Sequence, residues 1–133
     1  MMISLFLSFM ACSPCPTGEI LCDDLCVPES ITAAEIAEDI FAKSCAFSAC
    51  HSSAASASAG LQLHDEASLL ALINKPAAQD SNQMLIVAGD PSKSYLIHKM
   101  RGENMASGTE SMPPGTTLCE SKIQLVENWI ADL

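Results

Sequence analysis

The seven residues Cys45-Ala46-Phe47-Ser48-Ala49-Cys50-His51 are the most informative stretch of the sequence. They bring two thiols and an imidazole close together, and the consecutive Cys50 and His51 keep the second thiol and the ring in a fixed relation. Considered alone, the stretch allows a local Cys45–Cys50 disulfide, a pair of buried thiols beside a surface histidine, a thiol oxidoreductase site, or a zinc site completed by His98. The helices and loops predicted on both sides of the stretch help to decide between these kinds of site.

Helices joined by loops are predicted on both sides of this stretch. Four segments combine a start signal with an apolar face at helical spacing: 32–43, a segment capped by His64 or Asp65 and stopped at Asn74-Lys75-Pro76, 90–100, and 117–133. The first and last of these open with capping-box spacing, Thr32 with Glu35 and Thr117 with Glu120. No convincing strand and no internal repeat appear after Ser30, so the domain is predicted to be all-α.

The motif and its surroundings resemble a class I cytochrome c-like domain. Cys45, Cys50 and His51 resemble the attachment site of a c-type haem, whose usual spacing is Cys-x2-Cys-His; here four residues separate the cysteines, which lengthens the loop between them. Ser111-Met112-Pro113-Pro114-Gly115 resembles the family's methionine loop, in which a Met-Pro pair precedes the last helix. The two prolines remove backbone freedom and so lower the ordering cost of holding the thioether in place.

The resemblance extends over residues 31–133. Gly89-Asp90-Pro91 followed by Ser94-Tyr95-Leu96 matches the helix before the methionine loop, and Ile123 with Trp129-Ile130 matches the last helix. The resemblance is closest to small cytochrome c-like domains of myxobacterial and planctomycete surface proteins, several of which have the same long spacing in a Cys-Ala-x-Ser-x-Cys-His context. The expected fold is therefore a small helical domain around one haem, preceded by a cysteine-rich tether.

The resemblance also implies a cofactor and its ligands. Haem c would be attached covalently through Cys45 and Cys50, with His51 and Met112 as the two axial ligands of its iron. An iron with both axial positions filled passes electrons and has no open site for a substrate, so we expect electron transfer and no enzymatic activity. Four other residues are weaker candidates for the second ligand: Met84, Met100, Met105 and His98.

Composition limits the partners that the protein can have. Six Lys and Arg against 16 Asp and Glu give a net charge of −10, which argues against binding to nucleic acid and against a polybasic membrane patch. We expect a redox partner protein that presents a basic face. Aromatic residues make up only 5% of the chain, and a porphyrin would be the largest apolar body of such a core. Four residues are expected to pack against it: Phe41, Tyr95, Leu96 and Trp129.

The first 30 residues are predicted to form two further segments. Residues 1–11 are an apolar, signal-like run, and Cys12, which follows a small residue, is a candidate lipid-attachment site. Residues 12–30 are rich in cysteine and proline, which indicates a disulfide knot or tether. Seven cysteines favour an oxidising compartment, so we expect an exported bacterial protein, periplasmic or on the outer surface. Four cysteines remain for disulfides whose pairing the sequence leaves open: Cys15, Cys22, Cys26 and Cys119.

A second interpretation is a haem-free, disulfide-stapled binding or structural module of the cell surface, which a Cys45–Cys50 disulfide would mark. A thiol oxidoreductase is less favoured, because its cysteine pair normally begins a helix in a βαβ unit. Zinc is less favoured because the ligand spacing is missing. The sequence also contains no glycine-rich phosphate loop, paired-carboxylate motif or nucleophile elbow.

Overall fold

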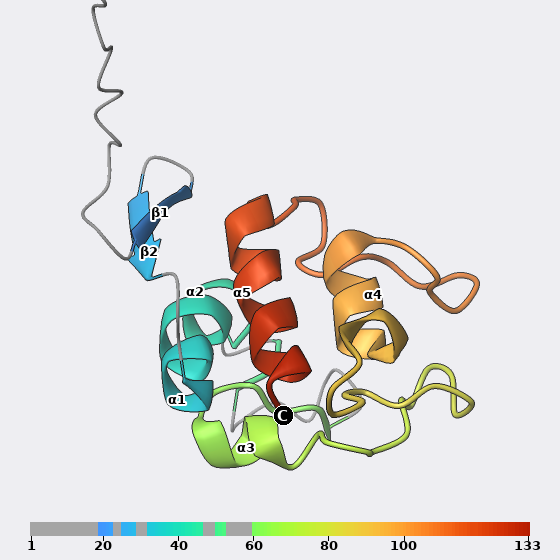
Figure 1. The fold of residues 1–133 in the computed structure, drawn as a ribbon. Coiled ribbons are helices and arrows are strands. Elements are labelled where there is room, and N and C mark those ends of the chain that lie inside the picture. Colours follow the sequence, from blue (N-terminus) through green and yellow to red (C-terminus); the bar gives the residue numbers. More distant parts are fainter. Residues whose placement is uncertain (1–18, 23–24, 29–31, 47–49, 53–59) are drawn as a thin grey trace, which may run out of the picture.

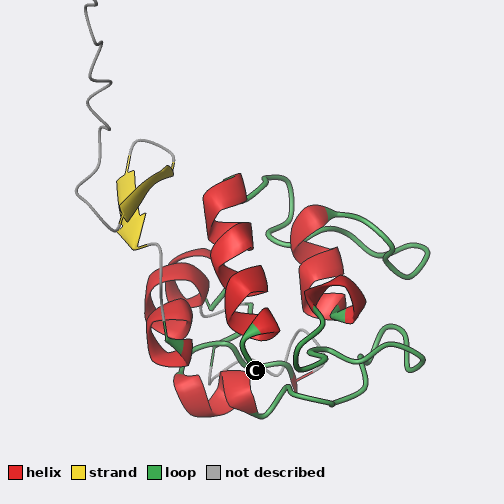
Figure 2. Ribbon diagram, viewed as in Figure 1, coloured by secondary structure: helices red, strands yellow, loops and turns green. Residues whose placement is uncertain are grey.

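The computed structural model describes residues 19–22, 25–28, 32–46, 50–52 and 60–133; the predictions for residues 1–11 and for Cys12 lie outside these ranges. Every element named from residue 32 onward is a helix, which agrees with the all-α prediction for the domain (Figure 2). In the part of the chain that the structure describes, no helix has the length and apolar character that a membrane crossing requires.

The segment predicted to be a knot or tether contains a short antiparallel hairpin that the sequence analysis did not predict. Its strands are β1 (Glu19–Cys22) and β2 (Leu25–Pro28), paired so that Ile20 lies across from Val27. Both of these residues are β-branched, and such residues favour the pleated strand conformation. Strand β1 contacts the C-terminal helix, so the hairpin lies against the helical domain.

The first helical segment follows the predicted range 32–43 closely. It consists of α1 (Ala33–Glu35), η1 (Ile36–Phe41) and α2 (Ala42–Ser44) in direct succession. Thr32 is the N-cap, and it forms the predicted capping box with Glu35. The middle part, η1, is a π-helix, in which the Ala42 N–H donates to the Ala37 carbonyl. This wider turn was not predicted, and such turns are rare and often lie beside functional sites.

The second and third predicted helices are shorter than expected. Helix α3 (Glu66–Leu70) begins at Asp65, whose carboxylate accepts from the Ser68 N–H at 2.7 Å, but it ends before the predicted stop at Asn74. The single helix predicted over 90–100 is wrong. A 3₁₀ turn, η3 (Pro91–Lys93), is separated from α4 (Tyr95–Arg101) by Ser94, whose backbone is extended.

Ser94 breaks this helix because its hydroxyl competes for backbone partners. The buried Ser94 Oγ donates to the Asp90 carbonyl at 3.0 Å and accepts from the Val87 N–H at 2.9 Å. The predicted end of the helix is confirmed: Arg101 occupies the last turn, and Gly102 follows it with φ of 74°, a left-handed conformation that suits glycine.

The last helix, α5 (Glu120–Ala131), starts later than predicted. Its N-cap is Cys119, and no side chain caps it, so the capping box predicted from Thr117 is wrong. Cys119 is disulfide-bonded, and this cross-link fixes the chain at the position where the helix starts. The predicted apolar face is confirmed for its four central members, which are buried: Ile123, Val126, Trp129 and Ile130. Leu133, the fifth, is exposed.

Helix α5 lies in the middle of the domain, with the α1–α2 segment on one side, α4 on the other and α3 across the end (Figure 1). The core between them is mostly aliphatic. Phe41, Tyr95, Leu96 and Trp129 all belong to this core and are buried. The helical framework therefore fills much of its interior with its own aliphatic side chains.

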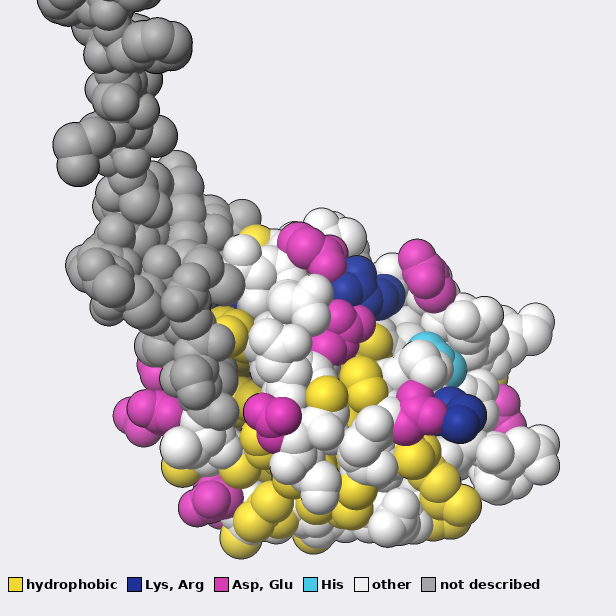
Figure 3. All heavy atoms as spheres, viewed as in Figure 1, with side chains coloured by type: hydrophobic (Ala, Val, Ile, Leu, Met, Phe, Trp, Pro, Cys, Tyr) yellow, Lys and Arg dark blue, Asp and Glu magenta, His cyan; other side chains and the backbone are white. Residues whose placement is uncertain are grey.

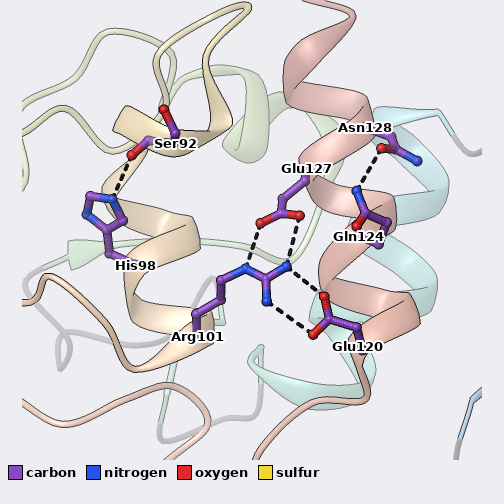
Figure 4. A network of polar contacts seen from close by, with 7 residues as sticks. All are labelled: Ser92, His98, Arg101, Glu120, Gln124, Glu127 and Asn128. Atoms are coloured by element: carbon purple, nitrogen blue, oxygen red, sulfur yellow. Dashed lines mark hydrogen bonds and ion pairs between the residues drawn. The ribbon is translucent and has the colours of Figure 1, made fainter.

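Arg101 joins α4 to α5 through two carboxylates (Figure 4). Its guanidinium donates to both oxygens of Glu127, at 2.7 and 2.9 Å, and to both oxygens of Glu120, at 2.8 and 3.1 Å. Bidentate pairs of this kind are stronger than single contacts and fix the orientation of both partners. The network therefore sets the distance between the helix that precedes the long loop and the central helix.

Replacing Arg101 by methionine is expected to lower the free energy of unfolding by about 1–2 kcal/mol, because it removes both bidentate pairs at a half-buried position. Urea unfolding checks this. Lys93→Met is the matched control, since Lys93 is exposed and forms one pair with Asp90; its expected cost is clearly smaller, because solvent screens an exposed ion pair. The hydrogen bonds from Arg101 lower the pKa of Glu120 below its ordinary value of 4.5. The stabilisation from Glu120 is therefore present above pH 4.5 and lost as the pH falls through the lowered pKa. Equal losses in the two variants would contradict the prediction.

Acidic side chains are spread over the face shown in Figure 3, and the prominent basic groups on it lie beside acidic ones. The ion pairs agree with this view: Arg101 pairs with Glu120 and Glu127, and Lys93 pairs with Asp90. Pairing neutralises these cations locally, so the net charge of −10 dominates the field around the molecule.

Candidate functional site

A pocket of about 380 Å³ lies where the end of the first helical segment meets the long loop before α5. Its lining contains all four residues that the sequence analysis selected, together with a serine and the two prolines of the loop: Ser44, Cys45, Cys50, His51, Met112, Pro113 and Pro114. We call it the thiol pocket. The fold therefore brings Met112 beside a motif that lies about sixty residues earlier in the sequence.

Backbone hydrogen bonds fix the described residues at the two ends of the motif. The N–H groups of Cys45 and Ala46 both donate to the Phe41 carbonyl at 2.7 Å, and because the Ala46 bond spans five residues, the helical segment ends in a wide turn at the first thiol. The His51 N–H then donates to the Cys45 carbonyl at 3.1 Å. This bond joins the two ends of the motif in spite of its four intervening residues. The long cysteine spacing thus leaves the two thiols and the ring at one pocket.

The His51 ring is held by a backbone carbonyl. It is 8% exposed, and its Nδ1 lies 3.0 Å from the Leu61 carbonyl oxygen. A carbonyl oxygen can only accept, so in the neutral ring Nδ1 carries the proton and Nε2 keeps its lone pair. The Leu63 N–H donates to the His51 carbonyl at 2.9 Å, which fixes the backbone as well. Metal-binding histidines have this arrangement, in which the nitrogen that is not bound to the metal donates to a carbonyl.

Both thiols of the motif are free in the structure, so the Cys45–Cys50 disulfide of the second interpretation is not formed. Cys45 is buried, and this burial, with a smaller contribution from the Cys50 charge, raises the pKa of the Cys45 thiol to about 12. Reactive thiols of oxidoreductases have a lowered pKa. The raised pKa of Cys45 therefore makes this thiol unsuited to be the attacking thiol of such a site.

In the haem-free chain, native alkylation of Cys45 at pH 8 is expected to be on the order of a thousandfold slower than that of an unstructured cysteine, because only the thiolate reacts. Cys50 is half-buried, and it should be modified first. Mass spectrometry of peptides after timed iodoacetamide treatment measures both rates. In denaturant the two cysteines should react alike. Labelling of Cys45 in the native chain as fast as that of an unstructured cysteine would contradict this prediction.

The alternative ligands lie elsewhere in the fold. Met100 is buried in the core, and neither Met84 nor Met105 belongs to the lining of the thiol pocket. His98 has both ring nitrogens engaged, Nδ1 with Gln83 Oε1 at 2.8 Å and Nε2 with the Ser92 carbonyl at 2.9 Å (Figure 4). Among the described residues no three His, Cys, Asp or Glu side chains gather as a metal site, which leaves the zinc interpretation without a ligand set.

The four residues expected to pack against a porphyrin are absent from the described lining of the thiol pocket. Phe41, Tyr95, Leu96 and Trp129 instead belong to the core. Their packing against a porphyrin therefore stays a prediction.

A wider groove of about 880 Å³ adjoins the thiol pocket and shares Ser44, Cys50, Pro113 and Pro114 with it. Lys43 and Lys122 are also in its lining. Lys43 pairs with Asp39 at 2.5 Å, at the exposed end of the first helical segment. Two of the six cations of this acidic chain thus lie beside the mouth of the pocket, a clustering that the sequence analysis did not anticipate.

Comparison with known protein families gives a match over part of the chain. A sequence model described as planctomycete cytochrome C matches residues 48–115, half of the chain. The chain belongs to the planctomycete cytochrome c family. No curated protein and no solved structure matches it. The matched segment of this cytochrome c contains Cys50, His51 and Met112 and begins after Cys45; the roles of all four residues stay predictions.

Membership in a cytochrome c family implies a haem cofactor, and the thiol pocket fits one. Its lining offers two free thiols for thioether bonds, an imidazole whose Nδ1 is already bonded, and a thioether. These are the donor types of a covalently attached haem with nitrogen and sulfur ligands. The other described residues of the lining are a serine and two prolines, none of which is an ionised group that would have to be buried against a porphyrin.

Proposed function

We propose that this planctomycete cytochrome c is a monohaem electron-transfer domain without substrate chemistry of its own. Cys45 and Cys50 would hold haem c covalently, and His51 Nε2 and Met112 Sδ would be the axial ligands. The observation that carries the proposal is the single pocket lined by these four side chains, in which the Nδ1–Leu61 hydrogen bond leaves His51 Nε2 available.

Each of these residues has a separate task. A bound haem supplies a one-electron couple. His51 offers a nitrogen whose direction is fixed by the hydrogen bond between Nδ1 and the Leu61 carbonyl. Met112 provides a soft thioether, which favours the reduced iron and raises the potential relative to a second histidine. Pro113 and Pro114 restrict the backbone beside Met112, so less freedom is lost when that side chain is held.

We infer the kind of redox partner from the net charge of the chain, and its location from the N-terminal segment. The net charge of −10 favours a redox partner with a basic face. We further propose that the protein is exported to the periplasm or the outer surface, with Cys12 as a lipid anchor and residues 12–30 as the tether. The contact between β1 and α5 and the disulfide at Cys119 support a tether that is fastened to the domain.

The net charge should control exchange with small redox reagents. Oxidation by an anionic complex such as ferricyanide is expected to speed up at least about threefold between 10 mM and 500 mM salt, and oxidation by a cationic cobalt complex should slow down, because salt screens repulsion and attraction alike. Stopped-flow absorbance measures both rates. If electrons leave beside the groove, Lys122→Glu should lower the rate of oxidation by the anionic complex further. Lys75→Glu, which lies outside the lining of the groove, should lower this rate less. Salt trends of the opposite sign would refute the charge argument.

The test of the function is expression of the full chain in a periplasm with haem-maturation machinery, followed by visible spectroscopy and intact mass. A sharp α-band on reduction and a mass increase of one covalent haem are expected. Double replacement of Cys45 and Cys50 by alanine is the control and should abolish the mass increase. A colourless wild-type chain with a Cys45–Cys50 disulfide would refute the proposal and leave the stapled surface module.

A further inference from the structure

The long loop that presents Met112 is attached to one face of α4. Tyr95 and Lys99 are four residues apart and so lie on the same side of this helix. The Tyr95 hydroxyl accepts from the Ala106 N–H at 3.2 Å, in the middle of the loop. The Lys99 Nζ donates to the Glu110 carbonyl, two residues before Met112. Two side chains of one helix face thus hold the loop at two positions.

Lys99 contacts the loop a second time through its backbone. Its carbonyl accepts from the Met112 N–H at 2.8 Å. One residue therefore bonds to the chain on both sides of Ser111, through its side chain at Glu110 and through its main chain at Met112. Because both bonds originate from a single helical position, the position of the Met112 backbone depends on the position of α4.

The burial of Lys99 calls for an explanation beyond stability. The residue is 7% exposed, whereas lysine is almost never fully buried without a partner. Among the described residues it takes part in none of the ion pairs, and its ammonium is bonded to a backbone carbonyl. Burying a charge in this way is costly, and an apolar residue of similar size would usually serve packing at least as well.

Helix α4 is in turn fixed relative to the rest of the site. Arg101, half a turn beyond Lys99, joins it to α5 through Glu127 and Glu120. Helix α5 contacts η1, whose Phe41 carbonyl accepts from the Cys45 N–H. A continuous set of contacts thus links Met112 to the first thiol of the pocket by way of Lys99, α4, α5 and η1.

We propose that Lys99 is a positioning residue for Met112: the bond from its ammonium to the Glu110 carbonyl holds the loop so that the Met112 side chain stays at the thiol pocket. This inference rests on the proposed function, since it assigns Lys99 a part in keeping the axial thioether in place. Lys99 is not in the described lining of the thiol pocket, and it acts through the loop.

Three variants test this role in the haem-loaded full chain. Lys99→Met keeps the apolar stem and removes the ammonium, Lys99→Arg keeps a cationic donor, and Lys75→Met is the control because it removes the same charge at an exposed site. Intact mass and thermal unfolding first establish that each variant carries haem and folds. The readouts are then the weak far-red band of a methionine–iron bond in the oxidised protein, and the reduction potential.

The expected result is that Lys99→Met loses at least half of the far-red band and has a lower potential, with the haem content unchanged. Lys99→Arg should keep most of the band, and Lys75→Met should be indistinguishable from the wild type. A purely structural role would lower the unfolding temperature without changing the band. A full band and an unchanged potential in Lys99→Met would overturn the proposal.

A separate measurement distinguishes failure of this inference from failure of the proposed function. If the wild-type full chain takes up no haem, the proposed function is refuted. The role of Lys99 is then tested by measuring hydrogen exchange of the Met112 amide in the purified haem-free chain. Exchange at least about tenfold faster in Lys99→Met than in the wild type, with Lys75→Met unchanged, would support its hold on the loop. Equal exchange in all three would overturn it.

Discussion

Replacing His51 by alanine is expected to remove the low-spin spectrum of the haem-loaded protein and to reduce the yield of that protein more than about tenfold. The imidazole is 8% exposed and is held at Nδ1 by the Leu61 carbonyl, so no other described side chain of the pocket can offer a nitrogen in its place. Visible spectra of the oxidised and reduced protein, with haem content per chain from the mass, measure the effect.

Two other histidines provide matched controls for this experiment. His64 is half-buried and pairs with Asp65 through Nε2 at 3.0 Å, and His98 is bonded to Gln83 and Ser92. Neither residue is in the described lining of the thiol pocket. His64→Ala and His98→Ala should therefore keep the α-band. A normal spectrum in His51→Ala, together with its loss in either control, would move the nitrogen ligand to that histidine.

Replacing Met112 by alanine is expected to abolish the far-red band and to lower the reduction potential by on the order of 100 mV, because a methionine ligand favours the reduced iron. The haem content should stay near that of the wild type, since Cys45, Cys50 and His51 are unchanged. Spectroelectrochemical titration measures both quantities in one sample.

Met105→Ala is the control for this variant, because Met105 lies in the same long loop but outside the described lining of the pocket. It should keep the band and the potential of the wild type. If the band survives in Met112→Ala and disappears in Met105→Ala, the ligand assignment is wrong. If both variants keep it, the ligand lies elsewhere in the chain.

The sequence predicted those features of the fold that depend on residues close to one another along the chain. The capping box of Thr32 and Glu35 starts the first helix as expected, because both of its hydrogen bonds form within four residues. The apolar spacing from Ile123 to Ile130 predicted the buried face of α5. Likewise, the compact cysteine–histidine motif and the Met-Pro-Pro loop identified four residues that the structure brings to one pocket.

The features that the sequence did not reveal depend on distant or competing partners. The break at Ser94 follows from a hydroxyl that bonds to Asp90 and Val87, and Thr117 is not the predicted N-cap because α5 begins at Glu120 with Cys119 as its N-cap. The carbonyls of Leu61 and Lys99, which hold His51 and Met112, have no signature in sequence because every residue has a carbonyl. Only the folded chain shows which of them are used.

The burial of Cys45 sets an order of events for the proposed attachment of haem. A thiol that is 7% exposed, with its pKa raised by burial, is a poor nucleophile and is hardly accessible from solvent. Attachment therefore has to precede complete folding, while the first thiol is still accessible. The same burial protects that thiol from adventitious oxidation in a chain that folds too early, so such a chain would accumulate as a stable, colourless by-product rather than as a precursor.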